Sequence, residues 1–195
     1  MTIGKVLPAL VVGALVIAGC GDDDSSGDSG SRAAGNGIDR AFVAEMVPHH
    51  QSAVEMAKIA QERGQSTFVK QFASDIIRTQ TREIAILRRE DESLRRAGIK
   101  RGSLGLSKHM MGMDGDMAML KTAKPFDPVF MKMMIGHHEG AIEMAKIELD
   151  KGQDPQLKAL AREIIDAQQR EIREMRKQLG ATGSSAGSMH HGSDG

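Results

Sequence analysis

The residues best suited to chemistry are two pairs of adjacent histidines, each preceded by a methionine at the same spacing. The motif Met-x-x-His-His stands at residues 46–50 and again at residues 134–138. Imidazole nitrogens and thioether sulfurs, without a thiolate, form a ligand set that favours copper and especially Cu(I). Imidazoles alone also accept Cu(II) or zinc. The motif therefore predicts a metal site built from Met46, His49, His50, Met134, His137 and His138.

These motifs belong to a long internal repeat. Residues 39–90 align without a gap to residues 127–178, at a constant offset. In each copy, apolar residues recur at spacings of three and four on both sides of a glycine, Gly64 or Gly152, which indicates two helices joined by a turn. We expect each glycine to take the left-handed conformation that often ends a helix. Two such hairpins predict an all-α fold, an antiparallel four-helix bundle over residues 38–180.

Helical phasing places the histidines on the face that the bundle must bury. Met46, His49, His50 and Met56 fall on one side of a helix, together with the small apolar residues between them. Buried imidazoles need polar partners, because each has two nitrogens to satisfy. Counting back from the turn sets the histidines level with the middle of the second helix. The partners predicted in this way are Gln80 and Glu83 in the first copy and Gln168 and Glu171 in the second. Glu83 and Glu171 are also predicted to belong to the metal site, as its carboxylates.

A purely structural interpretation stays open for the same residues. In it, the glutamine and glutamate satisfy core histidines, and the methionines only fill space. Metal binding is favoured because the motif recurs intact, and because Met and His are abundant where no core needs filling. The connection at residues 98–126 is one such place, with little helical periodicity. Its auxiliary metal ligands would be His109, Met110, Met111 and Met113.

The first twenty residues are typical of an export signal. Lys5 is followed by an apolar run from Val6 to Ala18, which is too short to cross a bilayer comfortably. The sequence ending at Cys20 resembles the bacterial lipobox, which predicts cleavage of residues 1–19 and lipidation of Cys20. An ordinary cleaved signal is the alternative. Residues 20–37 are rich in Gly, Ser and Asp and predict a flexible tether, and residues 181–195 predict a disordered tail.

Composition excludes several other functions. Lys plus Arg and Asp plus Glu both number 26, and the chain has no Trp or Tyr. Neither a basic surface nor a stacking platform for nucleic acid is therefore expected. Cys20 is the single cysteine, so a lipidated chain has no thiol left for a disulfide or a metal.

The repeated motifs resemble a bacterial family called domain of unknown function 305. Met-Val-Pro-His-His-Gln-x-Ala-Val-Glu-Met-Ala and Met-Ile-Gly-His-His-Glu-Gly-Ala-Ile-Glu-Met-Ala carry the resemblance, which covers about residues 38–180. It implies a ferritin-like four-helix bundle that is usually exported. Some members are similar to copper-binding proteins that protect cells from excess copper. The ligands implied by matching motif are Met46, His49, His50, Met56, Met134, His137, His138 and Met144.

The sequence is compatible with three functions. The first is a non-enzymatic lipoprotein that binds copper for buffering, resistance or delivery, with a metal-accepting protein or a second copy as partner. The second is a ferritin-like oxidase with two metal ions, which needs about four carboxylates and Glu-x-x-His motifs. Met46 and Met134 stand where those glutamates would be. The third is a metal-free helical bundle that displays an interaction surface at the membrane.

Overall fold

The computed structural model describes residues 35–187, with side chains as far as residue 181. Within this range the chain is all-helical, which confirms the predicted fold class. The predicted signal peptide, Cys20, the tether up to residue 34 and the tail beyond residue 187 lie outside the described residues. The helices are α1 (Gly37–Arg63), α2 (Thr67–Arg96), the short α3 (Met117–Thr122), α4 (Phe126–Lys151) and α5 (Pro155–Gly187).

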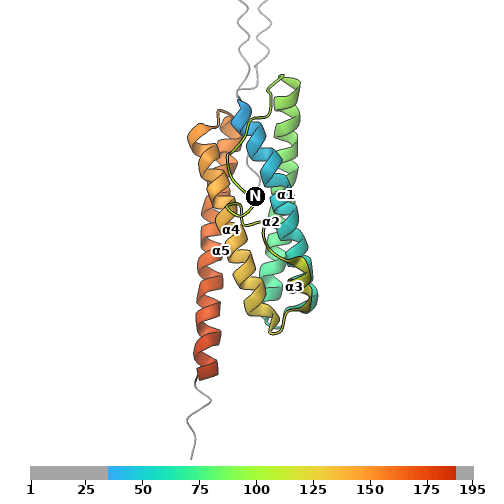
Figure 1. Cartoon of the computed structure of the whole chain (residues 1–195), viewed down its shortest axis with the longest axis vertical. Helices are drawn as coiled ribbons and strands as arrows, with labels where there is room; N and C mark the ends of the chain where they lie inside the picture. The colour runs from blue at the N-terminus through green and yellow to red at the C-terminus, as the bar shows by residue number, and fades with distance from the viewer. Residues whose placement is uncertain (1–34, 188–195) are drawn as a thin grey trace, which may run out of the picture. The chain divides into compact units, whose positions relative to one another are not determined.

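Four long helices form two antiparallel hairpins, one from each sequence repeat. α1 packs along α2, and α4 packs along α5. α1 also packs against α4, whereas α2 and α5 barely touch. Figure 1 shows that the connection after α2 runs back along the bundle to α3, so that α1 and α4 run in opposite directions. The two motif-bearing helices therefore lie side by side at the centre.

The buried apolar residues form two clusters, and the histidines lie between them. Met46 belongs to one cluster and Met56 to the other, although both are on α1. On α4 the order is reversed, with Met134 in the cluster of Met56 and Met144 in the cluster of Met46. Because the histidines follow Met46 and Met134 by one turn, they occupy the level between the two clusters.

Each hairpin caps the turn of the other. The Asp127 carboxylate, at the start of α4, accepts hydrogen bonds from the backbone N–H groups of Gln65 and Ser66 at 2.9 and 2.8 Å. At the matching position of α1, Asp39 accepts from Gln153 and Asp154 at the other turn. These carboxylates satisfy N–H groups at the start of a neighbouring helix, where the helix dipole also favours negative charge.

The turn glycines differ from expectation. Gly64 and Gly152 have φ values of −56° and −68°, so neither adopts the left-handed conformation. Glycine is needed there because space is lacking. A Cβ on Gly64 would lie 2.6 Å from the carbonyl oxygen of Ala60, and one on Gly152 would overlap the Glu148 carboxyl group.

α5 continues past residue 180, the predicted end of the bundle, to Gly187. Figure 1 shows it extending beyond the neighbouring helices. Once a helix is formed, each further residue adds a hydrogen bond without the cost of a new nucleus. None of the helices in residues 35–187 combines the length and apolar character that a bilayer span requires.

Candidate metal centre

The four histidines form one buried layer across the middle of the bundle. Each side chain is at most 2% exposed. The rings of His49, from α1, and His137, from α4, stack with their centroids 3.6 Å apart and their planes 34° apart. His50 and His138 flank this central pair, with ring centroids 6.2 and 6.4 Å from their chain neighbours. The two motifs therefore meet at the interface of the hairpins.

The outer histidines face the glutamates that the repeat predicts. His50 Nε2 lies 2.8 Å from Glu83 Oε2 in a buried hydrogen bond. His138 Nε2 lies equally close to Glu171 Oε2, although this contact lacks the alignment of a hydrogen bond. A carboxylate beside an imidazole sets its tautomer and orientation, and is the usual outer partner of a metal-binding histidine. The predicted pairing of the outer histidines with these glutamates is thus confirmed, whereas its role toward a metal stays a prediction.

The inner histidines have other surroundings than predicted. His49 Nε2 hydrogen-bonds to the carbonyl oxygen of Met111 at 2.9 Å, and not to Gln80. The connection approaches this closely because Gly140 on α4 leaves room: a Cβ there would overlap the Met111 carbonyl group. The chain has only one such connection, so His137 receives no corresponding partner. A backbone carbonyl has no signature in sequence, and the small residue on α4 was the only available signal.

Several buried polar atoms in this layer have no hydrogen-bond partner among the described residues. Both nitrogens of His137 are in this state, as is Nδ1 of each other histidine in the layer. The side-chain oxygens of Gln80 and Gln168 are also unpartnered. Since buried polar groups in proteins are almost always hydrogen-bonded, these atoms call for a further partner, such as water or an ion.

Burial keeps the inner imidazoles neutral. Desolvation, and then the neighbouring His50, lower the pKa of His49 from 6.5 to about 3. Desolvation, and then the neighbouring His49, hold the pKa of His137 well below its ordinary value. A neutral imidazole keeps the lone pair that a metal ion requires. The inner pair is therefore in its ligating form at neutral pH.

The methionines of the motif are buried, but they do not gather at one point. Met46 and Met134 are fully buried one turn from the histidines of their own helix. Met56 and Met144 lie in the opposite clusters, two turns beyond the histidines. The first pair is the better placed to add thioethers to the imidazole layer.

The four predicted auxiliary metal ligands of the connection do not lie together at one site. Met111 is buried in the core cluster that contains Met46. Met113 and Met111 line one surface pocket, whereas His109 and Met110 line another together with His137. Residues of the connection therefore line two separate surface pockets, one on each side of it.

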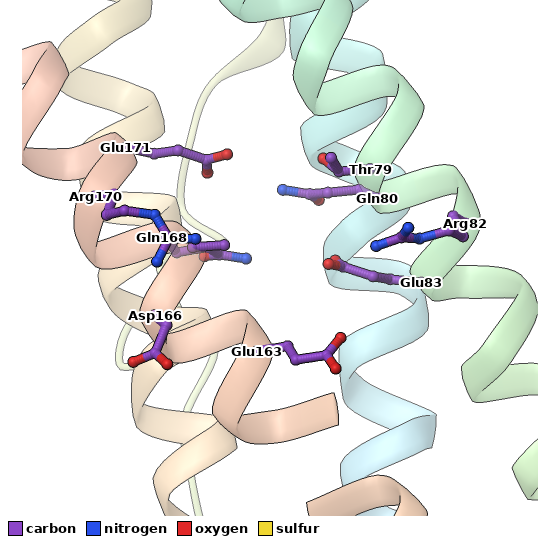
Figure 2. Close-up of a pocket in the computed structure, with 10 residues that line it drawn as sticks. Thr79, Gln80, Arg82, Glu83, Glu163, Asp166, Gln168, Arg170 and Glu171 are labelled. Carbon is purple, nitrogen blue, oxygen red and sulfur yellow. The ribbon is translucent and has the colours of Figure 1, made fainter. Parts of the chain in front are cut away.

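A polar pocket of about 350 Å³ lies between α2 and α5, over the outer histidines. Figure 2 shows Gln80 and Glu83 on α2 facing Gln168 and Glu171 on α5 across this space. Because α2 and α5 barely touch, the pocket opens between the two halves of the repeat, while the histidines themselves stay buried.

Side chains of His, Asp and Glu alone do not complete a metal site here. Among the described side chains, no three His, Cys, Asp or Glu groups are arranged to hold a metal ion. An ion in the layer must therefore also use thioether donors or turn the imidazoles about their side-chain bonds. Soft monovalent copper suits such a set, since it accepts both sulfur and nitrogen ligands.

The fold and site define an all-helical protein with a buried histidine layer between two repeated hairpins. Comparison with family models matches residues 39–179 to the domain of unknown function DUF305. The chain belongs to the DUF305 family, which confirms the resemblance found in its motifs. A shorter match, 45% identical over 49 residues, links it to the uncharacterized protein L153 of Acanthamoeba polyphaga mimivirus. That match spans 32% of the viral protein and 25% of this chain.

Solved structures of related proteins share the fold. CopM in its Cu(I)-bound form is 30% identical, with a TM-score of 0.61 over 73% of this chain and 96% of CopM. CopM has also been solved in a Cu(II)-bound form, with a TM-score of 0.64, 30% identity and the same coverage. A DUF305 fragment from Deinococcus radiodurans is 32% identical, with a TM-score of 0.62 over 74% of this chain and 96% of the fragment.

Proposed function

We propose that this protein binds copper in the histidine layer, with His49, His50, His137 and His138 as imidazole donors. The observation that carries the proposal is a layer of four buried imidazoles in which both nitrogens of His137, and Nδ1 of each other ring, have no partner among the described residues. An unsatisfied buried polar group costs about 1–3 kcal/mol, so retaining several in one layer needs compensation. A metal ion bonded to those nitrogens would supply it.

Met46 and Met134 complete the donor set in this proposal. They lie one turn before the histidines on the same helix faces, and both are fully buried. Met56 and Met144 lie about two turns beyond the histidines and place one further thioether on each side of the layer. Glu83 and Glu171 hold the outer imidazoles in place as partners of their ring nitrogens. The relatives solved with Cu(I) and Cu(II) support copper ahead of zinc.

We further propose that the protein works outside the cytoplasm, tied to a membrane through lipidated Cys20, and that it buffers copper or delivers it to a partner. The apolar segment ending at Cys20 supports this placement. A related DUF305 protein from Streptomyces coelicolor, 29% identical, is named as a candidate secreted protein. Because the single cysteine would carry the lipid, the soft metal ligands available to the protein are Met and His side chains.

The metal-free bundle is the main alternative. It would require that protein groups satisfy the histidines, as Glu83 does for His50. His137, with both nitrogens unpartnered, is not satisfied in this way. This difference favours a ligand for the layer over a closed structural network.

Metal analysis of the purified protein tests the proposal. Copper is titrated under reducing and oxidising conditions against a competing chelator, with zinc and iron in parallel. The double variant H49A/H137A should lose tight copper while keeping its helical circular dichroism. M131L, which alters a buried methionine of the same core outside the motifs, should bind as the wild type does. No bound metal in the wild type would support the metal-free bundle, and iron with oxidase activity would support the oxidase.

A further inference from the structure

A second pocket joins the surface of the protein to the histidine layer. It has a volume of about 590 Å³ and lies where the connection crosses α4. His109, Met110 and Asp114 line it from the connection, and Met133 and His137 line it from α4. His137 is only 2% exposed, and both of its ring nitrogens lack a partner. A residue of the buried layer thus lines a pocket that opens to solvent.

His109 is held in the manner of a metal-binding histidine. Its Nδ1 is hydrogen-bonded to the carboxylate of Asp114. A carboxylate can only accept, so Nδ1 carries the proton of this hydrogen bond, and the lone pair of the neutral ring is then at Nε2. Ligating histidines usually show this arrangement, with the far ring nitrogen donating to a carboxylate. The His109 side chain is 88% exposed, so the pairing has no role in core packing.

Two thioethers share the pocket with His109. Met110 is 54% exposed and therefore contributes little to the core. Met133 is partly buried on α4, three residues before Gly136, and its methyl group lies beside the connection at Gly115. Neither the repeat nor the Met-x-x-His-His motif singled out Met133. Sulfur and imidazole donors without a thiolate are again a set for a soft monovalent ion.

We propose that His109, Met110 and Met133 form a surface site that captures monovalent copper or silver and passes it to His137. This inference rests on the proposed function of the histidine layer. The ion would exchange a thioether or the His109 nitrogen for a free His137 nitrogen, with no change in its charge and no proton released. Met111 and Met113 take no part, since they line the pocket on the other side of the connection.

The test uses Ag(I), a diamagnetic ion that does not change its oxidation state, and the full chain with methionine methyl groups labelled for NMR. In spectra recorded as a function of time after less than one equivalent is added, the methyl signals of Met110 and Met133 should shift before those of Met46 and Met134. Replacing Asp114 by Ala should weaken Ag(I) binding at the surface site about tenfold, as loss of an outer histidine partner usually does. The matched control is M119L, which alters an exposed methionine that does not line the pocket.

Transfer kinetics test the second half of the proposal. Cu(I) supplied on a weak chelator should load the triple variant H109A/M110L/M133L about tenfold more slowly than the wild type, with equal final occupancy of the histidine layer. M119L should load at the wild-type rate. Unchanged loading in the triple variant, with first methyl shifts at Met46 and Met134 in the wild type, would overturn this inference and leave the proposed function standing. Failure of the wild type to bind Cu(I) or Ag(I) at all would overturn both.

Discussion

His49 and His137 stack across the interface of the two hairpins, with ring centroids 3.6 Å apart. They occupy equivalent positions of the two sequence repeats, yet their surroundings differ. His49 Nε2 donates a hydrogen bond to the Met111 carbonyl oxygen, whereas His137 has no hydrogen-bond partner at either nitrogen among the described residues. A repeat that is symmetric in sequence thus encloses an asymmetric centre.

This contact predicts that the two repeats share copper instead of binding it independently. H49A and H137A should each weaken copper binding strongly, and the double variant should lose little more than either single one. Residues that act as one unit give non-additive losses. Equilibrium titration of the three variants measures the effect. Two independent sites would show instead that each single variant removes half of the bound copper.

Acid should destabilise the metal-free protein through the inner histidines. The pKa of His49 is about 3 in the folded state against 6.5 ordinarily, so the unfolded chain binds the proton first as the pH falls. Stability from this group is complete above pH 6.5 and is lost on lowering the pH toward 3. Between pH 7 and pH 5 the loss through His49 is about 2 kcal/mol.

Urea unfolding of the metal-free protein at several pH values measures this loss. H49A should show a shallower decline than the wild type. M131L, which alters a buried residue without a titratable group, should decline as steeply as the wild type. Equal slopes for all three proteins would contradict the neutral buried state of His49.

Glu148 should act in the opposite direction. Desolvation, and then the neighbouring Asp39 carboxyl group, raise the pKa of Glu148 to about 9. The folded state therefore keeps a proton that the unfolded chain releases near pH 4.5, and stability falls as the pH rises from 4.5 to 9. E148Q keeps the shape and removes the titration, so it should gain stability relative to the wild type at pH 8. Unfolding midpoints of both proteins at pH 5 and pH 8 measure this gain. The same difference in stability between E148Q and the wild type at both pH values would refute the prediction.

Gly140 should be required for the contact between the connection and His49. A Cβ there would overlap the Met111 carbonyl group, so G140A should displace the connection and cost about 1–3 kcal/mol. Gly136 provides a matched control on the same helix, since a Cβ there meets no atom within 4 Å. G136A should stabilise α4 by about 0.5–1 kcal/mol. Thermal unfolding compares the two, and a stabilised G140A would contradict this packing.

The sequence by itself determined the helices, their pairing into hairpins and the burial of the histidines. The repeat and the helical spacing of apolar residues contain this information, because helix formation and the burial of one face depend on neighbours in the chain. Counting residues from each turn was enough to pair His50 with Glu83, since two antiparallel helices of equal rise stay in register. The prediction of a left-handed conformation at Gly64 and Gly152 was wrong. Glycine is needed there because of crowding by neighbouring atoms, which depends on the folded structure and has no sequence pattern.

Only the tertiary structure decided how the two hairpins meet. Stacking of His49 on His137 depends on the packing of α1 against α4, which no local pattern specifies. The Met111 carbonyl at His49 depends on the path of the connection, and every residue has a carbonyl, so side-chain identity does not mark it. Met133 likewise joins the surface pocket through long-range packing. Local periodicity sets which face of a helix is buried, whereas the complementarity of distant surfaces sets what that face contacts.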